Sequence, residues 1–505
     1  MVDSQFIYAM QPTSLGEKAM TSLARKVVLP QFERTNLACE DDPTARRIDI
    51  ESNGYISKTS YFVRSNMSPG ENDRRDGKPK WVPTQFNLYP VILYSDCAPW
   101  PEANLWILSM LESRVNPNMA SFHSIAEDMC AYARFIEDYD IDWLDFPSQK
   151  LARPTYRFNG HLKHLIQNQE IKASTAKRRM AAVIRFYRWL QEEGVLTMEN
   201  APWRESDRYV EFKGHYGQSL SKKVTTTDVS IRVAQQDDPY DGYINDGGKL
   251  RPLPQNEQEW LMDALTSLGN TEMTLIHLFG LVTGARIQTI LTFRVRDVLK
   301  DYGTDRQGFL RYPIGPGTGI DTKFDKRLVL HIPVWFYEML TIYALSERAK
   351  KRRLKAAGGD TENQYLFLSS HGAPLYAAKQ DVTHGDSKAL RHNKVGQGVR
   401  QYITDYIIPF IRKKYSPSFH YQFHDTRATF GMNLVDDRLR LIEDKKFTLK
   451  EALDFVQVRM GHSSPATTDR YLSFRSRLKI AYAVQDGWEA TLENMARCAM
   501  ELKNG

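Results

Sequence analysis

The chain has few cysteines and no long hydrophobic run. Its 505 residues include four cysteines, which lie far apart and form no C-x-x-C pair. A disulfide framework or a zinc cluster is therefore not expected, and this cysteine usage fits a reducing compartment. No apolar stretch reaches the length needed to cross a bilayer, and the first residues do not resemble a signal peptide. We therefore expect no membrane insertion and a cytoplasmic location.

A large charge of one sign is also missing. Lys and Arg number 68 against 61 Asp and Glu, which leaves a formal net charge of +7. This mild excess permits a polyanionic partner without requiring one. The hydrophobic fraction of 42% is ordinary for a globular protein, but 505 residues exceed one core of usual size. The chain is therefore expected to form two or three domains.

Periodicity and composition divide the chain into four parts. Strand-like segments occur at residues 61–63 and 89–94, and apolar residues then recur at helical spacing from about residue 102 to residue 215. Residues 205–250 are polar and without periodicity, which predicts irregular linker structure. The predicted parts are an N-terminal accessory region (1–100), a helical domain (101–215), a linker (216–250) and a final unit (251–505).

Two clusters of basic residues lie on predicted helices. In the helix expected to be capped by Ser174-Thr175 and to end at Gly194, the first turn carries Lys177, Arg178 and Arg179. Cations at this position oppose the helix dipole, so a phosphate-facing role would explain them, although a solvated cluster is equally compatible. The second cluster, within residues 350–355, is interpreted as a solvated helix end.

Three motifs in the final unit carry candidate functional side chains. TGAR places Arg286 among apolar residues directly after a Thr-Gly break, and a buried arginine needs an anionic partner. HDTR places His424 and Arg427 three residues apart, on one face of a helix. GHSS contains His462, and Tyr471 follows it after a predicted helix end and the start of a short second helix.

A fourth motif, IDTKFDKRLVLHIP, predicts a β-hairpin. Its alternating apolar residues indicate a strand, and Lys323 and Lys326 lie at the tip that precedes it. Lysines at hairpin tips are commonly solvated, and an arginine of the kind in TGAR commonly belongs to a structural ion pair. Each motif alone is therefore weak, whereas the ordered set of Arg, Lys, His-x-x-Arg, Gly-His and Tyr is strong.

This ordered set resembles the catalytic domain of the tyrosine recombinases, the family of phage integrases and of Cre- and Xer-like recombinases. The match covers about residues 255–475, and the helical domain resembles the family's core-binding domain. Two departures stand out: Thr289 is found where the family often has an acidic residue, and the spacing between the first arginine and HDTR is longer than usual. The fold class implied is mainly α with a small β-sheet: a helical core-binding domain, an α+β catalytic domain and an extra N-terminal region.

The resemblance implies a site-specific DNA recombinase or integrase, of the kind found in mobile genetic elements, that works through a 3′-phosphotyrosine. It needs no metal or cofactor, and it acts on double-stranded DNA as a homo-oligomer, a tetramer on paired sites. Lys323 matches the hairpin lysine better than Lys326. The implied catalytic residues are Arg286, Lys323, His424, Arg427, His462 and the nucleophile Tyr471, and the implied DNA-binding residues are Lys177, Arg178 and Arg179.

Simple chemistry agrees with these implied roles. Two guanidinium groups can hold the non-bridging oxygens of a phosphodiester as negative charge grows on them. His424 would accept the proton of Tyr471, Lys323 would protonate the departing 5′ hydroxyl, and His462 would donate to a phosphate oxygen.

Two alternatives and a C-terminal feature complete the sequence-based view. The alternatives are a type IB topoisomerase-like enzyme that relaxes DNA, and a non-catalytic DNA-binding protein of the same fold. An apolar helical stripe after the tyrosine can pack on its own domain, but the resemblance favours docking on a neighbouring protomer, as C-terminal segments commonly do in this family. The stripe comprises Val484, Trp488, Leu492, Met495 and Ala499.

Overall fold

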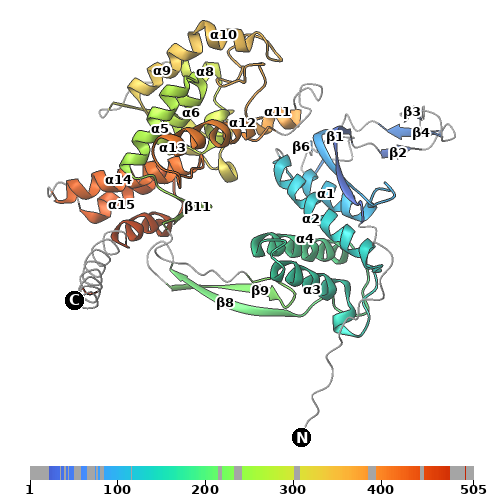
Figure 1. Ribbon diagram of the computed structural model, residues 1–505. Helices are drawn as coiled ribbons and strands as arrows, with labels where there is room; N and C mark the ends of the chain where they lie inside the picture. Colours follow the sequence, from blue (N-terminus) through green and yellow to red (C-terminus); the bar gives the residue numbers. More distant parts are fainter. Residues whose placement is uncertain are drawn as a thin grey trace.

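The computed structural model describes residues 22–477 with short gaps, together with Met495. The gaps are residues 34–35, 39–40, 42, 44, 51–58, 65–73, 76–77, 80–84, 115–116, 214–218, 233–241, 301–307, 385–393 and 444–447. Helices dominate the described chain and the strands form small antiparallel sheets, which confirms the predicted mainly α fold class (Figure 1). No helix in these residues combines the length and apolar character that a membrane span requires.

The first body combines a strand pair with four helices around an aromatic core. Trp100, Tyr132 and Phe186 are fully buried there, and the rings of Tyr132 and Phe186 both contact Trp100. Pro154 opens one helix, because its missing N–H is not needed in a first turn. The elements of this core are β1 (Arg25–Glu33), β7 (Gln85–Leu93), α1 (Pro101–Glu112), α2 (Met119–Asp138), the short η2 (Lys150–Ala152), α3 (Pro154–Gln167) and α4 (Ala173–Glu192).

The strands predicted near residues 61–63 and 89–94 are present. They belong to β4 (Thr59–Arg64) and β7, and β4 pairs with two further strands while β7 pairs with β1. The remaining strands of this region are β2 (Asn36–Ala38), β3 (Ala45–Ile50), β5 (Arg74–Arg75) and β6 (Lys78–Pro79).

Helix α4 begins earlier than the sequence suggested. Its first residue is Ala173, and no side chain caps it. Lys177, Arg178 and Arg179 therefore lie in its second turn, beyond the range in which the helix dipole acts strongly. The argument that these cations oppose the dipole is wrong for this reason, whereas the end of the helix at left-handed Gly194 is as predicted.

The expectation of irregular structure between residues 205 and 250 is wrong where the structure describes strands: β8 (Glu205–Lys213) and β9 (Ser219–Thr227), and the two-residue strands β10 (Ile244–Asn245) and β11 (Lys249–Leu250). Strands β8 and β9 form an antiparallel hairpin that Figure 1 shows below the helices of the first body. The described side chains of β8 are exposed, including Tyr209 at 70%, so no apolar alternation marked the strand. After β9, Val229 and Ile231 return to the core of the first body.

The second body is mainly helical and contains one longer hairpin. Phe279, Phe293 and Phe336 are fully buried in its core. Its elements are α5 (Gln255–Leu268), α6 (Thr271–Thr283), α7 (Ile287–Leu291), α8 (Val295–Val298), β12 (Phe309–Ile314), η3 (Lys323–Asp325), β13 (Leu328–Pro333), α9 (Val334–Leu345), α10 (Glu347–Arg353), α11 (Lys379–His384), α12 (Gln397–Tyr402), the π-helical turn η4 (Ile403–Ile407), α13 (Ile408–Lys414), α14 (Asp425–Glu443) and α15 (Leu449–Met460). Residues 465–477 are also helical.

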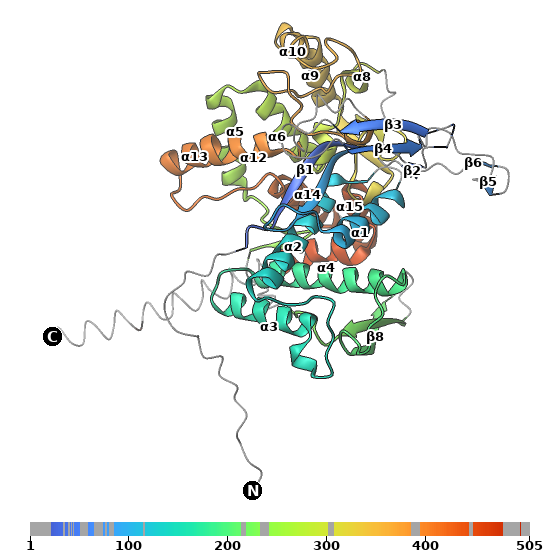
Figure 2. The same cartoon turned by 90° about the vertical axis from the view of Figure 1, so that its right-hand side faces the viewer.

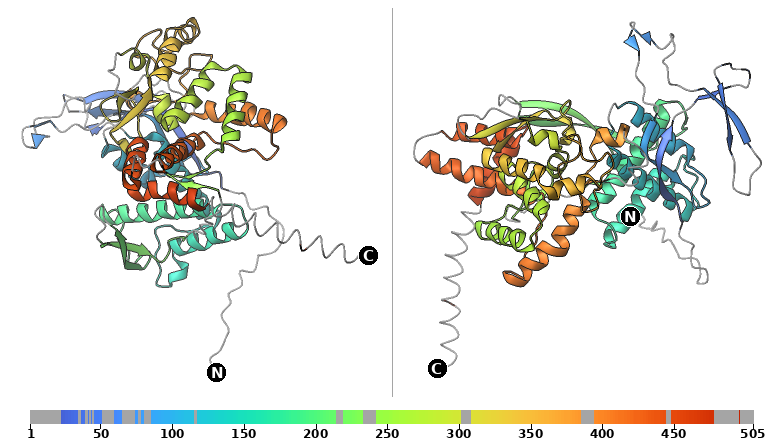
Figure 3. Two further views of the ribbon diagram at one scale, coloured as in Figure 1. Left: turned by 90° about the vertical axis from the view of Figure 1, so that its left-hand side faces the viewer. Right: turned by 90° about the horizontal axis from the view of Figure 1, so that it is seen from above.

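The two bodies touch through a segment of the second body. Ala377 and Val382 are buried within the core of the first body, and helix α11 contacts strand β7. The right-hand view of Figure 3 shows the two bodies side by side, and Figure 1 shows α11 on the side of the second body that faces the first.

The basic cluster of residues 350–355 is not simply solvated. Arg352 donates to Glu272 at 2.7 Å and to the carbonyl of Leu368, and Arg353 is buried and donates to the carbonyl of Ala344. Because Glu272 is fully buried on another helix, these arginines anchor α10 to the core, and the solvated interpretation is wrong for them.

Candidate active site

A single carboxylate lies where the candidate arginines meet. Asp246 is 5% exposed and stands in the turn of a small hairpin formed by β10 (Ile244–Asn245) and β11 (Lys249–Leu250). Its Oδ2 accepts a hydrogen bond from Nε of Arg427 at 2.7 Å, and its Oδ1 lies 3.4 Å from Nη2 of Arg286. The two arginines, 141 residues apart in the chain, thus share one anion.

His462 and Tyr471 reach the same carboxylate. Nε2 of His462 and the hydroxyl of Tyr471 each lie 3.2 Å from Oδ2 of Asp246. Since a carboxylate only accepts, Nε2 carries a proton, and Nδ1 is then the acceptor for the Thr468 hydroxyl 3.0 Å away. The imidazole is therefore oriented as a donor toward the anion position.

Turns between helices position the two arginines. Helix α6 ends at Gly284, which adopts a left-handed φ of 67°. The chain turns there, and Arg286 is the N-cap residue of the next helix, α7. Arg427 lies in the first turn of α14 and donates to the carbonyls of Gly284 and Met460 at 2.8 and 2.7 Å. Arg427 thereby fixes the ends of α6 and α15 beside the site.

Tyr471 lies inside the protein against helix α14. The tyrosine is fully buried, and Gly431 allows the close approach, because a Cβ at that position would overlap the Tyr471 ring. Burial, followed by the negative charge of Asp246, raises the pKa of the Tyr471 phenol above its ordinary value. The helix that carries Tyr471 begins at Pro465 and continues through residue 477, so it is longer than the short helix expected.

The two hairpin lysines have different surroundings. Nζ of Lys323 lies 3.4 Å from the carbonyl oxygen of Gly247, next to the shared carboxylate, and burial together with the charge of Arg286 lowers its pKa. Lys326 instead donates to the Ser463 hydroxyl at 2.7 Å. Lys323 is therefore the lysine that faces the arginines.

His424 directly precedes α14 and lies within the electrostatic reach of the same cations. Burial, and then the charges of Arg286 and Arg400, lower the pKa of His424 to about 4. Its imidazole is consequently neutral at neutral pH and able to accept a proton.

The cations of the site favour an anion strongly. Burial alone would raise the pKa of Asp246, but the hydrogen bond from His462 and the charges of Arg427 and Arg286 outweigh burial and hold this pKa well below its usual range. In the described part of the chain, no group of three or more His, Cys, Asp or Glu side chains is arranged to hold a metal ion.

The predicted DNA-binding residues lie on the first body, away from this site. Lys177 and Arg178 are exposed, and Arg178 pairs with buried Asp128 of α2 at 3.1 Å. Arg179 is partly buried beside the same carboxylate, and burial lowers its pKa. The cluster therefore combines an exposed edge with an internal ion pair.

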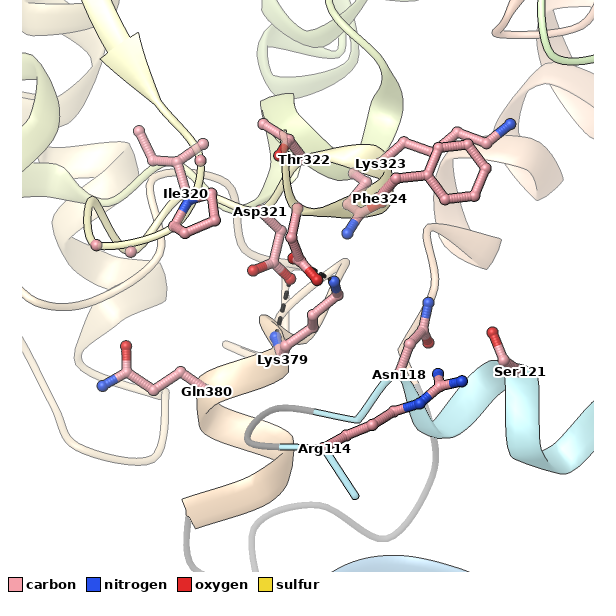
Figure 4. A pocket seen from close by; sticks show the side chains of 16 residues that line it. Arg114, Asn118, Ser121, Ile320, Asp321, Thr322, Lys323, Phe324, Lys379 and Gln380 are labelled. Carbon is pink, nitrogen blue, oxygen red and sulfur yellow. Dashed lines mark hydrogen bonds and ion pairs between the residues drawn. The ribbon is translucent and has the colours of Figure 1, made fainter. Parts of the chain in front are cut away.

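An open groove of about 870 Å³ lies between the bodies, next to the lysine hairpin (Figure 4). Arg114, Asn118 and Ser121 line it from the first body, and the hairpin tip with Lys323 and exposed Phe324 lines it from the second.

Sequence reasoning missed Asp246. The Asp-Gly-Gly sequence predicts only a turn, and an aspartate is common in turns, so no local signal distinguishes this residue. Thr289, at the position where the family often has an acidic residue, donates instead to the carbonyl of Asp321 at 2.9 Å.

Comparison with known proteins yields only distant structural similarity. No protein-family model matches the chain, and no curated protein matches it. Similar solved structures include the XerH site-specific recombinase bound to palindromic difH substrate (13% identity, 77% of this chain and 89% of that chain covered, TM-score 0.43). Others are a lambda integrase dimer bound to a COC′ core site (14%, 74% and 94%, 0.39) and the Tn1549 transposon integrase with circular intermediate DNA (14%, 75% and 98%, 0.40). At such TM-scores these similarities add no weight to the residue roles, which rest on the geometry above.

Proposed function

We propose that this chain is a tyrosine recombinase of the integrase type, which cleaves and rejoins double-stranded DNA through a covalent 3′-phosphotyrosine. The observation that carries the proposal is the convergence of Arg286, Arg427, His462 and Tyr471 on one anion position. A phenol next to two guanidinium groups and an imidazole donor is suited to attack a phosphodiester, whose charge grows in the transition state.

We assign each step of the reaction to one of the candidate residues. Tyr471 attacks phosphorus and gives its proton to His424, while Arg286, Arg427 and His462 hold the non-bridging oxygens. The bond to the 5′ oxygen breaks as Lys323 protonates that oxygen. Attack by another 5′ hydroxyl reverses these transfers, so the bond energy is kept and no nucleotide cofactor is required.

The same proposal covers the organisation of the chain. Residues 101–215 act as a DNA-binding domain and residues 251–505 as the catalytic domain, which together hold a duplex in the groove between them. Lys177, Arg178 and Arg179 contact phosphates, and the active assembly is a tetramer on paired sites. The C-terminal stripe proposed to join protomers lies outside the described residues apart from Met495, which is exposed.

Replacing Tyr471 with Phe tests the covalent step. Nicked duplexes made from DNA that flanks the gene should trap a protein–DNA adduct visible on a denaturing gel, with the DNA attached to the Tyr471 peptide. Tyr471→Phe should bind the same DNA but form no adduct, because the nucleophilic oxygen is missing. Tyr209→Phe, which changes an exposed tyrosine on β8, should keep the adduct.

An adduct of undiminished yield in Tyr471→Phe would contradict the assignment. Efficient relaxation of plasmids without target sites would favour a topoisomerase instead, and DNA binding without any adduct in the wild-type chain would favour a non-catalytic protein.

A further inference from the structure

The β10–β11 hairpin closes the candidate active site from the outside. In addition to the Asp246 contacts, the carbonyl of Asn245 accepts a hydrogen bond from Arg470 at 2.7 Å. Ile244 is buried in a small core that also contains Tyr471 and Met460. Strand β11 contacts α14, the helix that carries Arg427, and Figure 1 shows the two close together.

Asp246 occupies the position that a reacting phosphate needs. The same oxygen, Oδ2, is 2.7 Å from a guanidinium nitrogen of Arg427 and 3.2 Å from the hydroxyl of Tyr471. A phosphate attacked by this tyrosine must lie between these two groups, so carboxylate and phosphate exclude each other. Moreover, the fully buried phenol cannot reach a duplex while the hairpin is in place.

We propose that the hairpin of residues 243–250 is an autoinhibitory plug in which Asp246 serves as an internal phosphate analogue that DNA must displace. This inference rests on the proposed function and names the regulation of its site. It makes the nucleophile available only when a phosphodiester has replaced Asp246 at the arginines.

The hairpin is built to be displaced at moderate cost. Each strand has two residues, and isolated hairpins of this size are marginal in water. A phosphodiester presents two oxygens to the donors that Asp246 releases, so one set of charge-assisted hydrogen bonds replaces another. Gly247, with a left-handed φ of 71°, sits so close to Lys323 that the same movement frees the lysine amine.

The opposing interpretation is that Asp246 is a permanent counterion that orients the arginines in place of the acid absent at Thr289. The two interpretations predict opposite effects of removing the charge. A plug competes with anions, so its loss improves their binding. A counterion supports the site, so its loss weakens anion binding and cleavage.

The deciding experiment measures binding of inorganic phosphate to the full chain by calorimetry, without any need for cleavage. Asp246→Asn and Asp246→Ala should bind phosphate about tenfold or more tightly than wild type, because a closed site reduces apparent affinity by the fraction that is open. Asp381→Asn is the matched control, since Asp381 pairs with Arg294 at 2.9 Å outside the site, and its phosphate affinity should equal that of wild type. Equal or weaker binding by the Asp246 variants would overturn the plug.

Hydrogen exchange of the wild-type chain provides a second measurement that no folding defect can obscure. Saturating phosphate should accelerate amide exchange in residues 243–250, whereas unchanged or slower exchange would overturn the plug. On nicked DNA, the Asp246 variants should form adduct several-fold faster than wild type. If wild type and variants form no adduct while the variants bind phosphate more tightly, the proposed recombinase activity fails and the plug stands.

Discussion

The role of an arginine that pairs with a buried carboxylate in the second body depends on where that carboxylate lies. Arg348 and Arg352 pair at 2.7 Å with Glu272, which also accepts from the Tyr343 hydroxyl, so this carboxylate is fixed in the core. Arg286 meets the carboxylate of Asp246, which lies in the turn between two strands of two residues each. The first kind of pair stabilises the fold, whereas the second is the pair that the proposed plug would break when a substrate anion binds.

Replacing Arg286 or Arg427 with Ala should reduce adduct formation about 100- to 1000-fold while DNA affinity changes only a few-fold, because these groups act mainly on the transition state. The comparison requires single-turnover cleavage rates and equilibrium binding on the same nicked duplex. Arg311→Ala, at an exposed position of β12, should leave both quantities unchanged. Equal losses in DNA affinity and in cleavage rate would show that the arginines contribute to DNA binding alone.

Two histidines, the fully buried His277 and the partly buried His424, should make stability depend on pH. Burial lowers the pKa of His277 and, together with neighbouring cations, that of His424, each to about 4 from an ordinary value of 6.5. The unfolded chain therefore binds protons between pH 6.5 and 4 that the folded chain does not. Stability from this source is complete above about pH 6.5 and is lost as pH falls toward 4, by at most about 1.4 kcal/mol per pH unit for each histidine. Urea unfolding at pH 7, 6 and 5 measures this slope, and His424→Gln should make it shallower.

At the scale of elements, glycines decide how closely the helices of the site approach one another. Gly284 ends α6 in a left-handed conformation, and a Cβ there would overlap the ring of Phe430 on α14. Gly269 ends α5 with a similar φ of 64° but has open space around it. The two glycines have the same backbone requirement and differ only in packing.

Gly284→Ala should therefore destabilise the protein more than Gly269→Ala. The backbone conformation alone costs an alanine about 1 kcal/mol, and the overlap with Phe430 adds about 1–3 kcal/mol. Thermal unfolding of the two variants provides the measurement. Equal losses would show that α14 shifts freely away from α6, in which case the position of Arg427 would not depend on this contact.

At the scale of the whole molecule, two bodies meet at one small contact and enclose a groove. Val382 of the second body is buried in the first, and Arg114 and Asn118 of the first body line the same groove as Lys323 of the second. This arrangement suits a clamp whose halves hold one duplex, and it places basic side chains on both walls.

Replacing Lys177, Arg178 and Arg179 together with Ala should flatten the dependence of DNA affinity on salt, by about 0.9 in the log–log slope for each phosphate that the variant no longer neutralises. Binding should weaken for all sequences alike, because phosphates carry no sequence information. The control is Lys350 and Lys351 to Ala on α10, which Figures 1 and 2 place at the opposite end of the molecule from α4. An unchanged slope in the triple variant would show that these side chains are only solvated or paired with Asp128.

Local sequence alone predicted the parts of the site that depend on short-range geometry. The turn at Gly284, the break at Gly461 and the hairpin that carries Lys323 follow from residue types within a few positions, because glycine permits left-handed turns and alternation marks a strand. The family resemblance carried by the ordered motifs also predicted that His424 and Tyr471 lie near the two arginines, and both do in the folded chain.

Tertiary structure decided what depends on distant partners. Asp246 lies in a turn that looks ordinary, and only packing against residues 40 to 225 positions away makes it the anion of the site. In the same way, Arg352 belongs to the core because Glu272 of another helix is buried beside it, and β8 is a strand because β9 pairs with its backbone. Charge pairing and strand pairing over long separations leave no periodic pattern in the sequence, so they appear only once the chain is folded.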